Sequence, residues 1–166
     1  MATRIGIGYD VHAFAEGRPL MIGGVAIPHA RGLGGHSDAD VLIHAIVDAL
    51  MGAAGLGDIG THFPSSDPRW QGAPSSAFLT YTRDLLAAHG WRVGNLDAVI
   101  VAERPRLAPH IPAMRVELAH QLAIDLEQIS IKATTTDGLG FTGREEGIGC
   151  YAVALIERME PASPIA

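Results

Sequence analysis

The sequence predicts an α+β fold. Short segments with the alternating pattern of strands are interspersed with longer segments that have helical periodicity. The length of 166 residues suits one compact domain, and 48% of the residues are hydrophobic, which is typical of a globular chain. We therefore expect residues 1–160 to form a single domain and residues 161–166 to be a C-terminal tail.

The first strand is expected at Arg4–Tyr9, where apolar residues alternate with small ones. Two short apolar runs flank Gly23 and Gly24 within Pro19–Pro28, which predicts a tight hairpin. Three further apolar runs predict the remaining strands: Arg92–Ala102, Ile129–Ala133 and Ile148–Ile156.

Ser37 is predicted to be the N-cap of a first helix, with Asp40 at the N3 position of a variant capping box and Gly55 as the stop after residue 54. Two further helices are predicted at Ser75–His89 and Ile111–Leu122. The connecting loops are rich in Gly, Pro and polar residues, and lie at 31–36, 57–74, 104–109 and 134–146.

The charge and the cysteine content exclude several classes of protein. The chain has 18 acidic and 12 basic residues, a net charge of −6, so no nucleic-acid partner is expected. Cys150 is the only cysteine and is interpreted as a small hydrophobic residue in a strand. No apolar run reaches membrane-spanning length, and no signal peptide is recognised at the N-terminus, so we expect no membrane association.

Polar residues of the first strand and the first helix suggest a metal site. Asp10 and His12 are two residues apart, so in an extended segment their side chains share a face. The helix over residues 38–54 is apolar nearly all round, apart from Asp40, His44 and Asp48 at positions i, i+4 and i+8. Burying such a stripe without partners costs several kcal/mol, roughly 1–3 kcal/mol for each unmet neutral group.

Two interpretations of this stripe remain open. His44 either binds a metal or forms a buried hydrogen bond with a carboxylate. Asp10, His12 and His44 together would leave a fourth tetrahedral position open, the pattern of a catalytic zinc site. Asp48 either orients a histidine as an acceptor or makes a plain buried hydrogen bond.

Polar residues before helices and in turns suggest contacts with a substrate. Asp58 lies between glycines, where it either binds hydroxyl groups or forms a turn. His36 and Ser37 precede a helix, where free N–H groups attract phosphate, although Ser37 as a simple cap is equally consistent.

The segment from Lys132 to Thr136 leaves a strand and enters a loop. Its hydroxyl and N–H groups suit phosphate oxygens or a base, whereas the alternative is that the threonines simply favour strand structure. Arg144 either binds phosphate with two N–H groups or forms a surface ion pair with Glu145 or Glu146.

The chain resembles the 2-C-methyl-D-erythritol 2,4-cyclodiphosphate synthase family of the non-mevalonate isoprenoid pathway. The resemblance spans nearly the whole chain, and its motifs follow in order: GYDVHAF (8–14), IGGVAIP (22–28), HSDADVLIHAIVDALMGAAGLGDIGTHFP (36–64), AERPRLAPHIPAMR (102–115) and IKATTTDGLGFTGREEGI (131–148). It implies a ferredoxin-like α+β subunit with a mixed sheet and helices packed on one face. It also implies a homotrimer with active sites between neighbouring subunits.

The resemblance further implies roles for particular residues. Zinc would be held by Asp10, His12 and His44, and Asp137 would hold a second cation, Mg²⁺ or Mn²⁺. The residues expected to take part in catalysis are His36, Ser37, Asp40, Asp58 and Thr135. The residues expected to contact substrate are Asp10, His12, His36, Ser37, Asp58, Ile59, Gly60, Phe63, Ala102, Pro105, Arg106, Ala108, Ala133, Thr134, Thr135, Phe141 and Arg144. Phe141, Arg144 and Glu146 would line a central cavity that can hold an isoprenoid diphosphate.

Three positions depart from the family pattern. Asp137 replaces the usual Glu and keeps the charge on a shorter side chain, so water is expected to bridge it to the second cation. Arg106 replaces the usual Lys and is followed by Leu107 and Ala108, which changes a wall of the nucleotide pocket. Ser65 replaces a common acidic residue, which puts a sugar or loop contact in doubt.

The implied reaction is cyclisation of 4-diphosphocytidyl-2-C-methyl-D-erythritol 2-phosphate to the 2,4-cyclodiphosphate with release of CMP, in a bacterial cytoplasm. A metal-dependent phosphodiesterase or phosphatase acting on another small phosphorylated substrate would share the metal ligands. A non-catalytic zinc-binding trimer is the second alternative, although it has no need of a nucleotide pocket.

Overall fold

The protein, described by a computed structural model over residues 2–160, contains a five-stranded mixed sheet and a separate two-stranded hairpin. The predicted tail at 161–166 lies outside the described residues. The sheet has the order β4-β1-β7-β5-β6, and only β5 and β6 are parallel. Its strands are β1 (Thr3–Ala15), β4 (Gly32–Leu33), β5 (Trp91–Val101), β6 (Ile129–Thr134) and β7 (Gly147–Arg158), and the hairpin consists of β2 (Leu20–Ile22) and β3 (Val25–Ile27).

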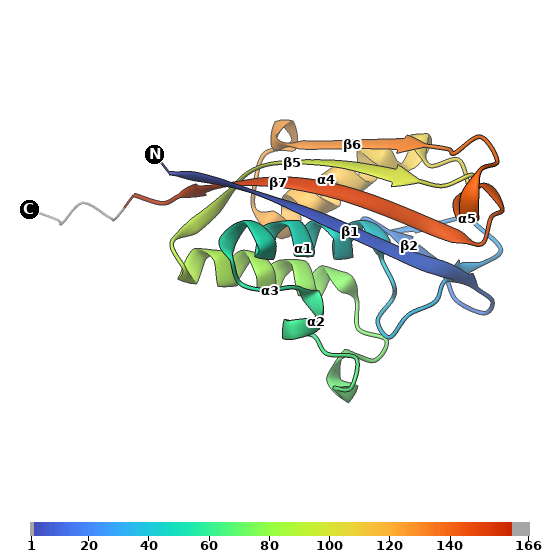
Figure 1. The fold of residues 1–166 in the computed structure, drawn as a ribbon, viewed down its shortest axis with the longest axis horizontal. Coiled ribbons are helices and arrows are strands. Elements are labelled where there is room, and N and C mark those ends of the chain that lie inside the picture. The colour runs from blue at the N-terminus through green and yellow to red at the C-terminus, as the bar shows by residue number, and fades with distance from the viewer. Residues whose placement is uncertain (1, 161–166) are drawn as a thin grey trace, which may run out of the picture.

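Three helices pack beside the sheet: α1 (Val41–Ala54), α3 (Ser75–Ala88) and α4 (Ile111–Leu122). Figure 1 shows α1 and α3 below the sheet and α4 behind it. Two shorter helices, α2 (Ile59–His62) and α5 (Gly140–Gly143), lie in segments that the sequence predicted to be loops. No helix within residues 2–160 is both long and apolar enough to cross a membrane. The α+β prediction is confirmed.

The predicted start of the first helix is wrong. The N-cap of α1 is Asp40, not Ser37, and its side chain accepts a hydrogen bond from the N–H of Ile43 at 3.0 Å. The same carboxylate accepts from the N–H groups of Gly23 at 2.9 Å and Gly24 at 2.7 Å. Three backbone donors satisfy this buried charge, so Asp40 joins the predicted hairpin to the start of α1 and moves the helix start past Ser37.

The first strand is longer than predicted, because pairing with β7 continues beyond Tyr9. Asp10 and His12 therefore lie within β1 and not at its end. Cys150 is buried in β7, which confirms its interpretation as a core residue.

Helix α1 lies unusually close to β1. A Cβ atom placed on Gly8 would lie 1.9 Å from the carbonyl oxygen of Ala45, and one on Gly6 would lie 2.0 Å from that of Ala49. Only glycine permits such an approach of helix and strand backbones. Gly6 and Gly8 share the inward face of β1 with Asp10 and His12, so the close approach also brings the helix side chains to those two ligands.

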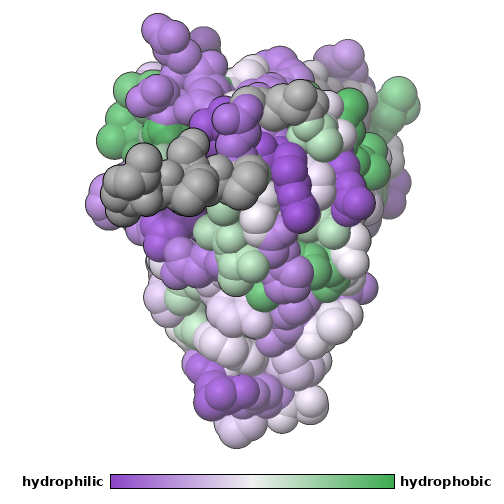
Figure 2. All heavy atoms as spheres, turned by 90° about the vertical axis from the view of Figure 1, so that its left-hand side faces the viewer, coloured by the Kyte–Doolittle hydropathy of each residue, from purple (hydrophilic) through white to green (hydrophobic). Residues whose placement is uncertain are grey.

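The opposite face of the sheet carries exposed apolar side chains. Ile5 and Ile7 are each 71% exposed, and the ring of Tyr9 packs at a tilt against that of Tyr151, with ring centroids 4.6 Å apart. Val153 continues this patch on β7. In Figure 2, hydrophobic residues gather at the flanks of the upper half, where Figure 1 places the sheet, and the lower half is mostly of intermediate hydropathy with hydrophilic residues at its bottom end.

We predict that Gly8→Ala destabilises the protein by about 1–3 kcal/mol or more. The new methyl group would clash with the helix backbone, and no side-chain rotation could relieve that clash. Gly52→Ala is the matched control, since Gly52 lies in α1 with no atom near its added Cβ. There the replacement is expected to stabilise the helix by up to about 1 kcal/mol. Chemical denaturation of the two variants measures the difference, and equal midpoints would contradict the close approach.

Candidate metal centre and substrate pockets

Asp10, His12 and His44 bring one oxygen and two ring nitrogens to a single point. Oδ2 of Asp10 lies 2.9 Å from Nε2 of His12 and 3.1 Å from Nδ1 of His44, and the two nitrogens are 3.1 Å apart. Donor atoms of a tetrahedral zinc ion lie roughly 3.3–3.4 Å apart when its bonds are about 2.0–2.1 Å long. The three ligand atoms could therefore hold such an ion after moving slightly apart.

The imidazole ring of His12 is also held by contacts on the side that faces away from the cluster. Nδ1 of His12 lies 2.7 Å from the carbonyl oxygen of Gly34, which can only accept a hydrogen bond, so Nδ1 carries a proton and Nε2 is the nitrogen that would bind a metal once it gives up its own proton. A Cβ on Gly35 would lie 3.1 Å from the ring of His12, so a larger residue there would crowd this ligand. Such outer contacts are what orients a metal-binding histidine.

The charges of the cluster attract a cation. Burial opposes ionisation of Asp10, but hydrogen bonds and positive charge from His12 and His44 outweigh it and hold the pKa of the carboxyl well below its usual range. Burial likewise works to lower the pKa of His12, but its hydrogen bond to Asp10 and the charge of Asp10 raise it overall. The cluster therefore holds a negative charge that a proton partly offsets, and a divalent ion would take that proton's place.

The three ligands lie at a pocket of about 260 Å³. Of the residues predicted to contact substrate, His36, Ser37, Ile59, Gly60 and Phe63 line it. The sequence did not identify Trp70 and Phe78, which line the pocket too and pack edge-to-face, with ring centroids 5.4 Å apart. Aromatic side chains are common in protein cores, so their residue type did not mark Trp70 and Phe78 as pocket residues. Ser65 also lines the pocket, so a small hydroxyl stands where the family usually has a carboxylate.

Three aspartates of the sequence analysis lie outside the pocket lining. Asp40 is fully buried on the hairpin amides described above. Asp48 accepts a hydrogen bond from the N–H of Ile59 at 2.7 Å, which confirms the interpretation as a plain hydrogen bond and positions the start of α2. Asp58 is the N-cap of α2, and Oδ1 accepts from the N–H and the hydroxyl of Thr61 at 2.8 and 2.7 Å. These hydrogen bonds lower the pKa of Asp58, so it is a carboxylate at neutral pH.

A second pocket of about 370 Å³ forms where β5 and β6 end. It is lined by seven of the residues predicted to contact substrate: Ala102, Pro105, Arg106, Ala108, Ala133, Thr134 and Thr135. Leu107 lines it as well. The parallel pairing of β5 with β6 explains this, because the two carboxyl ends of parallel strands meet at one edge.

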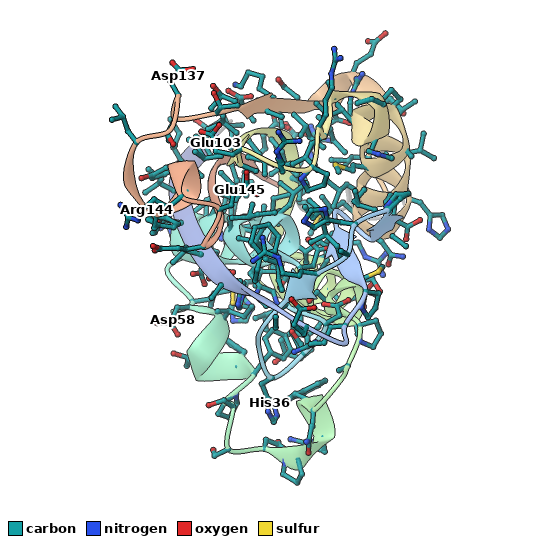
Figure 3. The ribbon with its side chains drawn as sticks, turned by 90° about the vertical axis from the view of Figure 1, so that its right-hand side faces the viewer. His36, Asp58, Glu103, Asp137, Arg144 and Glu145 are labelled. Carbon is teal, nitrogen blue, oxygen red and sulfur yellow. The ribbon has the colours of Figure 1, made fainter. Side chains whose placement is uncertain are left out.

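Glu103 organises the loop beside the second pocket and was not singled out from the sequence. Its Oε1 accepts from the N–H groups of Thr136 at 2.9 Å and Gly138 at 3.2 Å. Between them, Asp137 has a positive φ of 52° and Thr135 donates to its Oδ1 at 3.2 Å. The loop thus presents Asp137 on an exposed tip, away from His36 and Asp58, as Figure 3 shows.

A smaller hollow of about 230 Å³ lies on the apolar face of the sheet, and Phe141 lines it together with Tyr9 and Tyr151. Arg144 lies nearby in sequence and forms an exposed ion pair with Glu146, with Nε 2.7 Å from Oε1. The predicted surface ion pair is therefore present. Exposed pairs of this kind contribute little to stability, so Arg144 can exchange Glu146 for another anion.

An α+β domain with an open two-histidine, one-aspartate cluster in a pocket is typical of a metal-dependent enzyme. A family model described as the YgbB family matches residues 3–157, and the chain belongs to this family.

Curated relatives cover almost the whole chain. A protein of Thermosynechococcus vestitus is 60% identical over 157 residues, which are 95% of this chain and 98% of the relative. A protein of Pseudomonas paraeruginosa is 59% identical over 92% of this chain and 98% of its own length. Both are named 2-C-methyl-D-erythritol 2,4-cyclodiphosphate synthase, which confirms the predicted family.

Solved structures agree in fold. The bifunctional IspDF of Campylobacter jejuni is 40% identical with a TM-score of 0.92, and the match covers 96% of this chain and 43% of that one. The IspF of Plasmodium falciparum, described as a CDP complex, is 34% identical with a TM-score of 0.84 over 96% of this chain and 98% of that one.

We predict that His44→Ala abolishes stoichiometric zinc binding and leaves the protein folded, because two ligands cannot retain the ion and the vacated space lies at a pocket. His120→Ala is the control, as His120 is an exposed histidine on α4. Zinc content after dialysis, measured beside circular dichroism, tests this. A folded His44→Ala variant that still carries one zinc ion per chain would rule out the cluster as the metal site.

Proposed function

We propose that this chain catalyses the cyclisation of 4-diphosphocytidyl-2-C-methyl-D-erythritol 2-phosphate to 2-C-methyl-D-erythritol 2,4-cyclodiphosphate with release of CMP. The names of its curated relatives confirm the enzyme class that the resemblance predicted. The observation that supports the proposal is the second pocket, which seven of the predicted substrate contacts line together. A phosphatase of simple substrates needs no second pocket of this kind.

The reaction needs alignment and charge neutralisation more than a strong base. The attacking 2-phosphate is already an anion at neutral pH, and CMP leaves as a phosphate. A divalent ion held by Asp10, His12 and His44 would supply positive charge that offsets the repulsion between the phosphates. Holding the two groups in line is worth roughly 7–11 kcal/mol in well-oriented intramolecular reactions.

The chain's own residues provide that orientation. Ser37 lines the metal pocket and offers a hydroxyl to a phosphoryl oxygen, and Arg18 holds its loop by donating to the carbonyl oxygens of Gly35, at 2.6 Å, and of Ser37. His36 lines the same pocket with Nε2 3.1 Å from the carbonyl oxygen of Asp67. Thr135 would contact the diphosphate from the second pocket. For Asp40 we propose an indirect part, in which it positions the start of α1.

Asp58 is proposed to bind the erythritol hydroxyls. Within residues 2–160 its hydrogen bonds to other residues use Oδ1 alone, which leaves Oδ2 for an external donor. Its neighbours Ile59 and Gly60 line the metal pocket, so a bound sugar there lies close to it.

We further propose that the active form is a homotrimer of ferredoxin-like subunits with sites between neighbours. Within one subunit, His36 and Asp58 lie toward one end of Figure 3 and Glu103 and Asp137 toward the other. A single substrate would therefore take its sugar and nucleotide contacts from two subunits. The exposed apolar face of β1 and β7 supplies a surface for such an assembly.

The second cation and the isoprenoid diphosphate implied by the family would be bound by exposed residues. Asp137 is proposed to hold Mg²⁺ or Mn²⁺ together with substrate phosphates, since magnesium is commonly bound by one or two carboxylates plus phosphate. Phe141, Arg144 and Glu146 would line a central cavity that takes an isoprenoid diphosphate. The bacterial cytoplasmic location stays a prediction.

We predict that Asp58→Asn lowers kcat/KM by about 10–100-fold, the size expected for a lost hydrogen bond to a charged group, while zinc content stays at the wild-type level. Asparagine still caps α2, so the fold is retained. Phosphorus NMR of the product mixture follows the reaction, and Asp84→Asn on α3 is the exposed control.

A wild-type product that is linear and hydrolysed would overturn the proposed cyclisation in favour of a phosphodiesterase. Full activity of Asp58→Asn would leave the cyclisation standing but remove Asp58 from the substrate site.

We predict that Ile7→Asp converts the trimer to monomers, because a charge would be buried without a partner in the assembled form. Val116→Asp on the exposed face of α4 is the control and is expected to stay trimeric. Light scattering after size exclusion gives the mass of each. A wild-type monomer with full activity would contradict sites shared between subunits.

A further inference from the structure

A second carboxylate reaches the metal cluster through a buried hydroxyl. Asp38 lies in the loop before α1, Ser75 is the first residue of α3, and His44 is in α1. The hydroxyl of Ser75 donates to Oδ1 of Asp38, and its backbone N–H donates to Oδ2 at 3.0 Å. Oγ of the same serine lies 2.9 Å from Nε2 of His44, and Ser75 is fully buried.

The direction of these hydrogen bonds follows from the number of protons. A carboxylate can only accept, and a serine hydroxyl has one proton to give. Because that proton goes to Asp38, Ser75 can only accept from the imidazole, and Nε2 of His44 carries the ring proton. Nδ1 is then left with a free lone pair, directed at the Asp10–His12 pair.

Two carboxylates compete for this one ring proton. Asp10 lies 3.1 Å from Nδ1, so in the absence of a metal it would draw the proton to that atom. A proton on Nδ1 would occupy the lone pair that a metal needs. Ser37 lies on the same side of the ring as Ser75, with its Oγ 3.1 Å from Nε2; one of its lone pairs accepts from the N–H of Ala39, and the second can accept the ring proton.

We propose that Asp38 and Ser75 are positioning residues which hold the proton of His44 on Nε2, so that Nδ1 is ready to bind the divalent ion. The inference rests on the proposed metal site. It gives α3 a part in the reaction, because the first residue of that helix determines which ring nitrogen of His44 on α1 carries the proton. It also explains why a serine at a helix start is fully buried and paired to a carboxylate of another segment.

The test compares Ser75→Ala with Ser76→Ala. Ser76 is the next residue of α3, and its side chain makes no hydrogen bond within the described residues. Zinc affinity measured by chelator competition is expected to fall by about 10–100-fold in Ser75→Ala, the usual loss when an outer contact of a metal-binding histidine is removed. Ser76→Ala should match the wild type.

Long-range proton–nitrogen NMR of the zinc-free protein gives the tautomer of His44 directly. The wild type and Ser76→Ala are expected to carry the proton on Nε2, whereas Ser75→Ala should populate the Nδ1–H form. A merely structural serine would leave the tautomer unchanged. Asp38→Asn serves as a second variant, because an amide cannot accept both hydrogen bonds from Ser75, and it should change both readouts in the same direction.

The outcomes separate the two proposals. Wild-type protein that binds zinc with the His44 proton on Nδ1, or equal zinc affinities of Ser75→Ala and Ser76→Ala, overturns this inference alone. Wild-type protein that binds no zinc overturns the metal site and this inference together.

Discussion

The contact between the backbones of α1 and β1 is the constraint on which the site depends. Two glycines on the inward face of β1 let the helix approach to a distance that any side chain would forbid. The next two inward positions of the same strand are Asp10 and His12, and the facing turn of the helix carries His44. The candidate metal cluster forms here because one strand face changes from glycine to Asp10 and His12 where the helix crosses it.

The same strand also supports the proposed assembly of subunits. With glycine and polar residues on its inner face, β1 turns its isoleucines outward, the reverse of an ordinary half-buried strand. The apolar outer face favours assembly. The metal pocket and the nucleotide pocket lie toward different ends of the subunit, and assembly would pair one with the other across neighbours.

Much of this arrangement could be predicted from local pattern. The Ile111–Leu122 helix matches its prediction, because a proline near its start and apolar periodicity define it locally. The hairpin at Gly23 and Gly24 was also predicted from a local pattern, two glycines between short apolar runs. Both glycines adopt the positive φ that such a turn requires. Two spacings, one of a strand and one of a helix, indicated Asp10, His12 and His44 as candidate ligands, but only the resemblance to the family assigned all three to one metal ion.

What could not be predicted depends on contacts between distant segments. Ser37 has the residue type of an N-cap, but the helix begins at Asp40 because the amides of a distant hairpin meet that carboxylate. The link from Asp38 to Ser75 joins positions 37 residues apart, and no local spacing reveals it. Glu103 supports a loop 33 residues further along the chain in the same way.

The most direct test of the account is anomalous diffraction at the zinc absorption edge from crystals of the protein. The account predicts one strong peak per chain, about 2.0–2.1 Å from Oδ2 of Asp10, Nε2 of His12 and Nδ1 of His44. A fully loaded protein whose anomalous peak lies elsewhere, with these three atoms bound only to one another, would contradict it.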